Sequence, residues 1–215
     1  MSLRRYTSEY EYTFTYDSQN RIVGVNISSY DKTWSMSYTY TENTLVIENY
    51  DGWNGFANYI FSFDNGKLTS SRIDFHNAER DDRIFTYLYE GNNSKPSVMK
   101  EGNWETSYVW DDKGNLIQYS DDDLHLIYTG IENKCNIQLE NFCFNFFGIY
   151  APLDRNVFSC IANKELLQAI GQGSSSPRYT YSYKLDEDGY PVEVYENEVG
   201  DNQSTYASKY VLTYY

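Results

Sequence analysis

Residues 10–17 of this chain read YEYTFTYD, and this stretch decides the fold. Aromatic residues occupy every second position, and Glu or Thr fills the positions between them. A period of two residues is typical of a β-strand whose two faces meet different surroundings. Asp17 and the polar residues 18–20 then favour a turn. The stretch therefore predicts a strand that ends in a tight hairpin.

The same pattern returns at a fixed interval. Its first three copies are Tyr12, Phe14, Tyr16 and Asp17; Tyr59, Phe61, Phe63 and Asp64; and Tyr108, Trp110 and Asp111. These marker aspartates lie 47 residues apart both times. A fourth copy with Tyr179, Tyr181, Tyr183 and Asp186 comes 75 residues after Asp111. Because the repeat runs through both halves, we expect residues 1–215 to form a single β-repeat domain.

The alternation and the turn residues between the copies predict an all-β fold. About 15 strands are expected, near residues 9–17, 21–29, 33–41, 44–50, 57–64, 67–75, 82–90, 95–101, 104–111, 115–120, 124–130, 133–140, 178–185, 191–197 and 204–214. Tight turns between successive strands favour a long antiparallel meander. A sheet of this size cannot stay flat, so it should curl into a soluble barrel-like or rolled sheet.

One segment, residues 142–177, departs from the repeat. It begins with several phenylalanines, and Leu166, Leu167 and Ile170 after Asn163 suggest a short helix with an N-cap. We expect this insertion to be mostly non-strand. A barrel of about 15 strands is too wide for its own side chains to fill. The apolar insertion is therefore a candidate plug against the aromatic face.

Composition limits the partners and the compartment. The 215 residues carry a net charge of −14, which disfavours nucleic acid and anionic membranes as partners. Solubility is a more ordinary reason for this acidity than cation binding. No stretch reaches the roughly 20 apolar residues of a membrane helix. Residues 1–3 read MSL and resemble a cloning remnant, so we expect that an export signal or lipid-anchor cysteine has been removed.

The marker copies resemble the YD repeats of the Rhs class, through Tyr16-Asp17 and its echoes at residues 63–68 and 110–116. The chain is more specifically similar to a family of uncharacterised cell-envelope proteins of gut Bacteroidetes, a domain of unknown function with a porin-like fold. This resemblance implies a cell-envelope or secreted location, with a lipid anchor as one form of it, and it brings no catalytic residues. A pore is not expected, because the face opposite the aromatic residues is rich in Thr, Ser and Glu, which lipid would not accept.

No residue set predicts catalysis, a metal or a cofactor. His76 and His125 stand alone, and the acidic runs 121–123 and 186–188 suit hairpin turns better than a calcium loop. Cys135, Cys143 and Cys160 have no metal-ligand spacing. Buried thiols are favoured for them, with a Cys135–Cys143 disulfide as the alternative. We therefore expect a protein that is not an enzyme.

Three tryptophans are the candidate ligand-binding residues. Trp34, Trp53 and Trp104 lie in or just after polar linkers, so they should ring the end of the barrel opposite the marker turns. Exposed aromatic platforms beside Asp and Asn could stack on sugar rings; packing over the mouth of the roll is the alternative. Two functions remain open: a non-enzymatic envelope-associated or secreted module that binds a glycan or other small ligand, or a structural and protein-interaction scaffold related to YD-repeat shells. A hydrolase ranks third.

Overall fold

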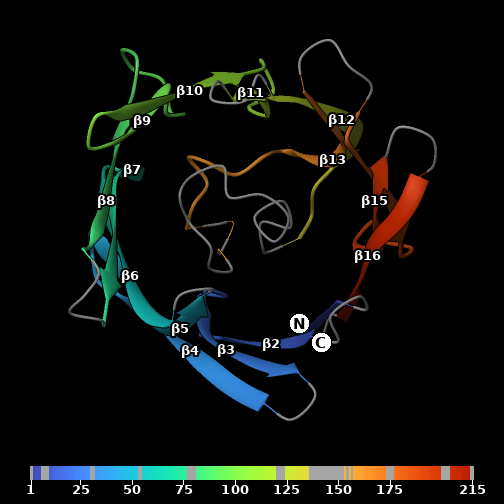
Figure 1. The fold of residues 1–215 in the computed structure, drawn as a ribbon, viewed down its shortest axis with the longest axis horizontal. Helices are drawn as coiled ribbons and strands as arrows, with labels where there is room; N and C mark the ends of the chain where they lie inside the picture. Colours follow the sequence, from blue (N-terminus) through green and yellow to red (C-terminus); the bar gives the residue numbers. More distant parts are fainter. Residues whose placement is uncertain are drawn as a thin grey trace.

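A computed structural model describes residues 2–5, 10–29, 32–52, 55–76, 81–119, 124–135, 153, 155, 157–172, 177–199 and 204–213. Sixteen β-strands run through these residues and form one sheet (Figure 1). They are β1 (Ser2–Arg5), β2 (Tyr10–Tyr16), β3 (Ile22–Ser29), β4 (Lys32–Tyr40), β5 (Thr44–Gly52), β6 (Gly55–Asp64), β7 (Lys67–Phe75), β8 (Arg83–Leu88), β9 (Val98–Glu101), β10 (Trp104–Trp110), β11 (Leu116–Tyr119), β12 (Leu124–Glu132), β13 (Glu165–Gln172), β14 (Tyr179–Leu185), β15 (Pro191–Val199) and β16 (Ser204–Thr213).

The sheet is an antiparallel meander that closes on itself. Each strand pairs with its neighbours in sequence, and β1 pairs with both β2 and β16. Leu3 lies opposite Tyr12 on one side and Leu212 on the other. Figure 1 shows the resulting ring, with the two chain ends beside each other. The predicted all-β antiparallel meander, curled into a barrel, is confirmed.

Three local predictions were wrong. Strand β1 was not expected, and Asn133–Cys135 belong to no strand, whereas 136–140 lie outside the described residues. The helix expected around Leu166–Ile170 is strand β13. The pairing of β12 with β13 contains register shifts at Ile127/Tyr128 and Tyr128/Glu132. Such bulges interrupt the period of two, so Leu166 and Leu167 are both buried and their spacing imitates a helix.

The aromatic face of the repeat points into the barrel. Phe14, Tyr59 and Phe61 are buried, and Phe61 has no exposed surface at all. Their outward neighbours Thr13 and Thr15 are exposed. The alternation seen in the sequence therefore corresponds to inside and outside, as expected.

The marker aspartates close hairpins through their side chains. Asp17 Oδ1 accepts hydrogen bonds from the backbone N–H groups two and four residues later, both at 2.9 Å. Asp111 and Asp186 make the same pair of bonds, at 3.0 and 2.8 Å in each turn. The residue three positions after each aspartate has a positive φ: 60° at Asn20, 88° at Gly114 and 83° at Gly189. Only glycine and a few residues such as asparagine tolerate this conformation, which explains both residue types there.

The copy at Asp64 uses a different turn. Asn65 and Gly66 form a two-residue connection with φ values of 49° and 75°. Two successive positive φ angles are typical of the hairpin turn that matches strand twist. The repeat thus conserves the position of the hairpin but not its backbone geometry.

Tyrosine hydroxyls tie successive strands together at the marker end of the barrel. The hydroxyls of Tyr40, Tyr89 and Tyr128 donate to the carbonyls of Ile22, Leu68 and Leu116, at 2.7, 2.9 and 2.7 Å. Each of these carbonyls belongs to an early, fully buried residue of the strand that follows a marker turn. Tyr183 makes an equivalent bond of 2.6 Å to Leu167 O. These bonds account for tyrosine rather than phenylalanine at the four positions.

We predict that Tyr40→Phe and Tyr128→Phe each lower the free energy of unfolding by about 1 to 2 kcal/mol, because a partly buried carbonyl loses its donor. Urea denaturation measures this change. Thr39→Val, on the outer face beside Tyr40, is the control and should change stability by less than about 0.5 kcal/mol. Equal stability of the two tyrosine variants and the parent protein would contradict the structural role of these hydroxyls.

Candidate functional site

The two ends of the barrel differ in their connections. The marker turns all lie at one end, here called the marker end. The connections β3–β4, β5–β6, β7–β8 and β9–β10 lie at the other, here called the Trp rim. Trp34 is near the start of β4 and Trp104 is the first residue of β10, so both lie at the Trp rim. Trp53, between β5 and β6, lies outside the described residues.

The structure does not bring Trp34 and Trp104 into one site. Five strands stand between β4 and β10, which corresponds to about 29 Å along the sheet. Trp34 is half-buried and packs against the interior cluster, so its ring fills space. Trp104, in contrast, is 75% exposed. Of the described tryptophans, Trp104 is the one that presents an open indole face.

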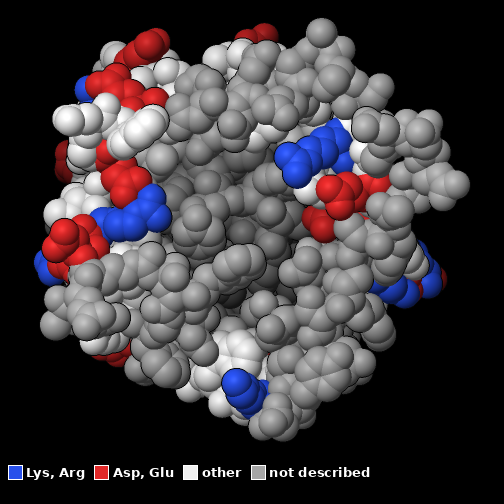
Figure 2. Space-filling view, viewed as in Figure 1, with Lys and Arg blue, Asp and Glu red and all other residues white. Residues whose placement is uncertain are grey.

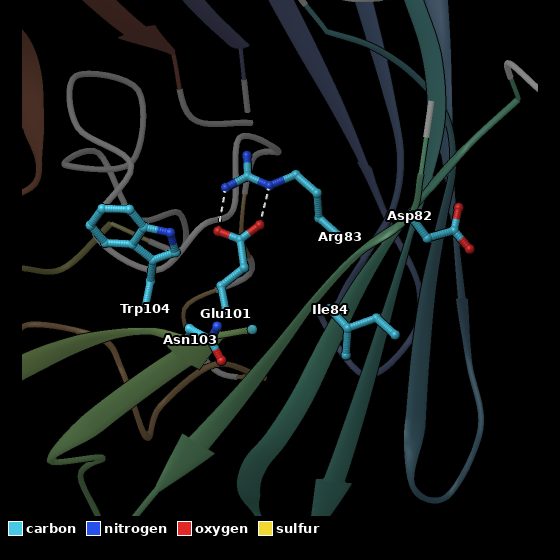
Figure 3. A pocket seen from close by; sticks show the side chains of 7 residues that line it. Asp82, Arg83, Ile84, Glu101, Asn103 and Trp104 are labelled. Carbon is cyan, nitrogen blue, oxygen red and sulfur yellow. Dashed lines mark hydrogen bonds and ion pairs between the residues drawn. The ribbon is translucent and has the colours of Figure 1, made fainter. Parts of the chain in front are cut away.

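Trp104 lines an open pocket of about 540 Å³. It is lined by Asp82, Arg83, Ile84, Glu101, Gly102, Asn103 and Trp104 (Figure 3). These residues come from the start of β8 and from the β9–β10 hairpin, whose connection consists of Gly102 and Asn103. Gly102 has a φ of 57°, which allows this tight turn. We call this group of residues the rim pocket.

Strand register explains why the polar side chains of the rim pocket meet. Trp104 lies opposite Glu101, and Glu101 lies opposite Phe85 on its other side. Arg83 is two residues before Phe85, so it shares the inward face of β8. Arg83 Nε and Nη2 bind Glu101 Oε1 and Oε2 at 2.5 and 2.6 Å. This fork-shaped ion pair stands beside the indole of Trp104 (Figure 3).

The basic residues around the rim pocket are matched by acids. Arg72 binds Asp82 at 2.5 Å, and Lys100 binds Glu105 on the adjacent strands. Together with the Arg83–Glu101 pair, these contacts leave no excess of positive charge at the pocket. The pocket therefore combines an apolar platform, an amide and a neutralised ion pair.

A second polar group lies on the inner face of β14 and β15. Glu196 is only 6% exposed and accepts a hydrogen bond of 3.2 Å from the Tyr181 hydroxyl. Tyr179 bonds to Glu198 at 3.4 Å. Figure 2 shows acidic and basic side chains gathered on two sides of the ring, one over the region of β8 and β9 and the other near β13 and β15. The inner wall is thus polar in two places.

The sequence placed Glu101 and Asn103 in the polar linker before Trp104, but it did not single out Arg83 or its pairing with Glu101. Their signal was the alternation itself: Arg83 and Glu101 occupy inward positions that elsewhere hold aromatic or aliphatic residues. A charged side chain on the apolar face of a strand is out of pattern, and two of them on neighbouring strands indicate a pair. Finding the partner still required the register between β8 and β9.

Several other residues that the sequence raised as candidates lie within the described part of the chain. Asp186 acts in its turn, as expected, whereas residues 121–123 lie outside the described residues. His76 is exposed and His125 is half-buried. Cys135 and Cys160 are buried, and Cys143 lies outside the described residues. Within the described ranges, no three His, Cys, Asp or Glu side chains gather so as to hold a metal ion. That part of the chain also contains no helix long and apolar enough to cross a membrane.

Two solved structures share this fold. A porin-like protein from Bacteroides vulgatus has a TM-score of 0.65 and 18% identity, over 100% of this chain and 97% of the other. A porin-like protein from Bacteroides uniformis has a TM-score of 0.59 and 16% identity, over 98% of this chain and 94% of the other. Neither a protein-family model nor a curated protein matches the chain. The porin-like fold that the sequence resemblance implied is confirmed.

Proposed function

We propose that the chain is a non-enzymatic binding module of the cell envelope or of a secreted protein, and that the rim pocket takes a neutral glycan. The observation that carries this proposal is the 75% exposed indole of Trp104 beside the Arg83–Glu101 ion pair. An aromatic ring has a flat apolar face and, in tryptophan, an N–H donor, so an exposed indole beside polar groups is suited to a contact with a ligand.

The chemistry of the rim pocket suits a sugar ring. The face of the Trp104 indole offers a flat apolar platform for the C–H face of a pyranose. Glu101 can accept hydrogen bonds and Asn103 can both donate and accept, which matches sugar hydroxyls. Ile84 also lines the pocket, at its outer edge, because it alternates with the inward-facing Arg83 and Phe85 along β8. A few placed polar groups around an apolar floor are typical of small-molecule sites.

The local charges favour a neutral glycan over an acidic one. Arg72, Arg83 and Lys100 each pair with a carboxylate of this chain. A uronate or sulfate would have to displace one of these carboxylates. The net charge of −14 adds long-range repulsion of polyanions.

The polar residues on the outer face of the barrel support the proposal that this face contacts water rather than lipid. Asn26, Ser35, Thr39 and Glu48 are exposed on β3, β4 and β5. Membrane barrels carry an outward apolar band instead, and a charged residue there is destabilising. The envelope location rests on the porin-like fold shared with Bacteroides proteins, and secretion or a lipid anchor are forms of the same proposal.

One observation favours a second function, the protein-interaction scaffold. Ile84, Leu88 and Val109 are exposed aliphatic residues on β8 and β10. Scattered aliphatic residues are common on protein surfaces, so this support is weaker than that for the rim pocket.

We predict that Trp104→Ala weakens binding to a neutral polysaccharide at least about tenfold, because the loss of the stacking platform removes about 1.4 kcal/mol or more. Calorimetric titration with soluble β-1,4-glucan, xylan and mannan measures this. Tyr190→Ala is the matched control, since Tyr190 is an exposed aromatic residue at the marker end and should leave affinity unchanged. If none of the three polymers binds, the scaffold reading is preferred.

Charge selectivity gives a second prediction. A β-1,4-glucan oligosaccharide should bind at least about tenfold more tightly than the same oligosaccharide oxidised to uronate at C6, because the ion-paired rim offers no spare cation. Affinity for the neutral form should change little between low and high salt. Tighter binding of the oxidised form would overturn the neutral class while leaving a glycan module in place.

We also expect the chain to remain monodisperse after purification without detergent, and not to float with phosphatidylcholine vesicles, because its outer wall is polar. Size-exclusion chromatography and vesicle flotation test this. A requirement for detergent, or recovery with the vesicles, would contradict a barrel that stands in water.

A further inference from the structure

We propose that the marker end of β6–β11 forms a docking surface for residues 157–164 of the same chain, and that these residues are a separable plug. We call this surface the socket. Its members are Phe61, Phe63, Lys95, Asn115 and Leu116. The described part of the segment between β12 and β13 lies inside the ring of strands (Figure 1). Three groups of contacts carry the proposal.

Lys95 pins the C-terminal end of a single turn in the segment. The N–H groups of Ile161 and Ala162 both donate to Phe158 O, at 2.9 and 3.0 Å, which closes the turn. Lys95 Nζ donates to Ser159 O at 3.1 Å and to Ala162 O at 2.6 Å. A lysine suits such carbonyls because they carry partial negative charge and lack donors within the turn.

Lys95 is partly removed from water. Its ammonium lies 4.7 Å from the centre of the Trp110 ring. Burial, together with Lys164 and Arg155 nearby, lowers the pKa of Lys95 to about 8. A partly buried ammonium group needs hydrogen-bond acceptors in place of water, and the carbonyls of Ser159 and Ala162 supply them.

Two asparagines exchange hydrogen bonds between the segment and the barrel. Asn115 Oδ1 accepts from the backbone N–H groups of Lys164 and Glu165, at 2.8 and 2.9 Å. Asn163 Oδ1 accepts from the N–H of Leu116 at 2.8 Å. Asn115 and Asn163 are 0% and 5% exposed. Buried amides recognise backbone groups in this arrangement, so the contact is specific as well as close.

A comparison of the marker turns indicates that one copy is adapted for this role. Four residues after the marker aspartate stand Arg21 in the first turn, Asn115 in the third and Tyr190 in the fourth. Arg21 folds back onto Asp17 at 2.7 Å, and Tyr190 is exposed. Asn115 likewise donates to Oδ2 of its marker aspartate, Asp111, at 3.0 Å, but its own Oδ1 also accepts from the segment. The third marker turn thus has the same backbone geometry as the first and fourth, but its side chain at this position, Asn115, binds the segment.

Gly114, in the same turn, leaves room for the side chain of Lys95. A Cβ at this position would come within 3.3 Å of Lys95 Cε, closer than most Cβ contacts. Its φ of 88° independently favours glycine. The third turn therefore makes space for Lys95 as well as presenting Asn115.

Aromatic contacts complete the socket. Phe158 is fully buried and meets Phe61 edge-to-face, with ring centres 4.9 Å apart and an angle of 82°. It also meets Phe63 at 5.5 Å and 61°. Such pairs add stabilisation beyond the area that they bury. Phe158 thus anchors the segment on the wall opposite β12 and β13.

The hydrogen-bonded pairing of the strands does not involve the segment. Each of the sixteen strands pairs with two others, and none of these pairings uses residues 157–164. The segment packs into the core through Phe158, Cys160 and Ile161, and its polar contacts to the barrel come from Lys95, Asn115 and Asn163 at the marker end. A segment that lies outside the strand pairings can open as a unit, at a free energy below that of global unfolding. We therefore infer that the plug can leave the socket while the ring of strands stays folded.

Hydrogen exchange on the full chain tests this inference. Lys95→Met and Asn163→Ala should each speed amide exchange in peptides covering 157–165 by at least about tenfold, while peptides from β3 and β4 change by less than about twofold. Arg21→Ala is the matched control, because it alters the same position of another marker turn. It should leave exchange in 157–165 unchanged.

Two outcomes would overturn the proposal. Exchange that rises equally in β3, β4 and 157–165 would make the segment an integral part of the core, as would failure of both variants to fold. No acceleration in 157–165 with either variant would show that Lys95 and Asn163 do not hold it.

Discussion

A closed sheet of sixteen antiparallel strands encloses more space than the side chains of its own inner face fill easily. Much of the molecule answers this constraint. The inner face carries tyrosine, phenylalanine and tryptophan in place of small residues, and Phe158 from the β12–β13 connection packs among them. Close packing is the normal state of a protein interior, because voids forfeit dispersion contacts. The internal segment thus fills space that a barrel of this width would otherwise leave empty.

The sequence repeat gives one end of the barrel a series of similar hairpin turns. At the marker end, Asp17, Asp111 and Asp186 close hairpins in the same way, and tyrosine hydroxyls bind the first buried carbonyls. This end therefore has a fixed frame. The rim pocket lies at the opposite end, the Trp rim. Function in many folds resides on the loops that a rigid scaffold holds in place.

Much of this architecture could be predicted from sequence because a period of two and a constant repeat are local signals. The alternation of residues 10–16 decided inside and outside, and Asp17 decided the turn. Strand β13 was misread as a helix, since bulges opposite Tyr128 placed Leu166 and Leu167 both in the interior. Bulges depend on the partner strand, which local sequence does not contain. The same reason hid the candidate site: Trp104 could be named, but its neighbours Arg83 and Glu101 became visible only once β8, β9 and β10 were in register.

The pairing of β1 with β16 joins the first and last described strands of the chain. All the other pairings in the ring link strands that follow each other directly, so they can form as the chain lengthens. The seam is the single exception, with a very high contact order and a large loop-closure entropy. Until Ser204–Thr213 have been synthesised, strand β1 has one bare edge, open to other chains. We therefore expect the β1–β16 pairing to form last as the ring closes. Before it forms, the bare edge of β1 makes the chain most prone to aggregation.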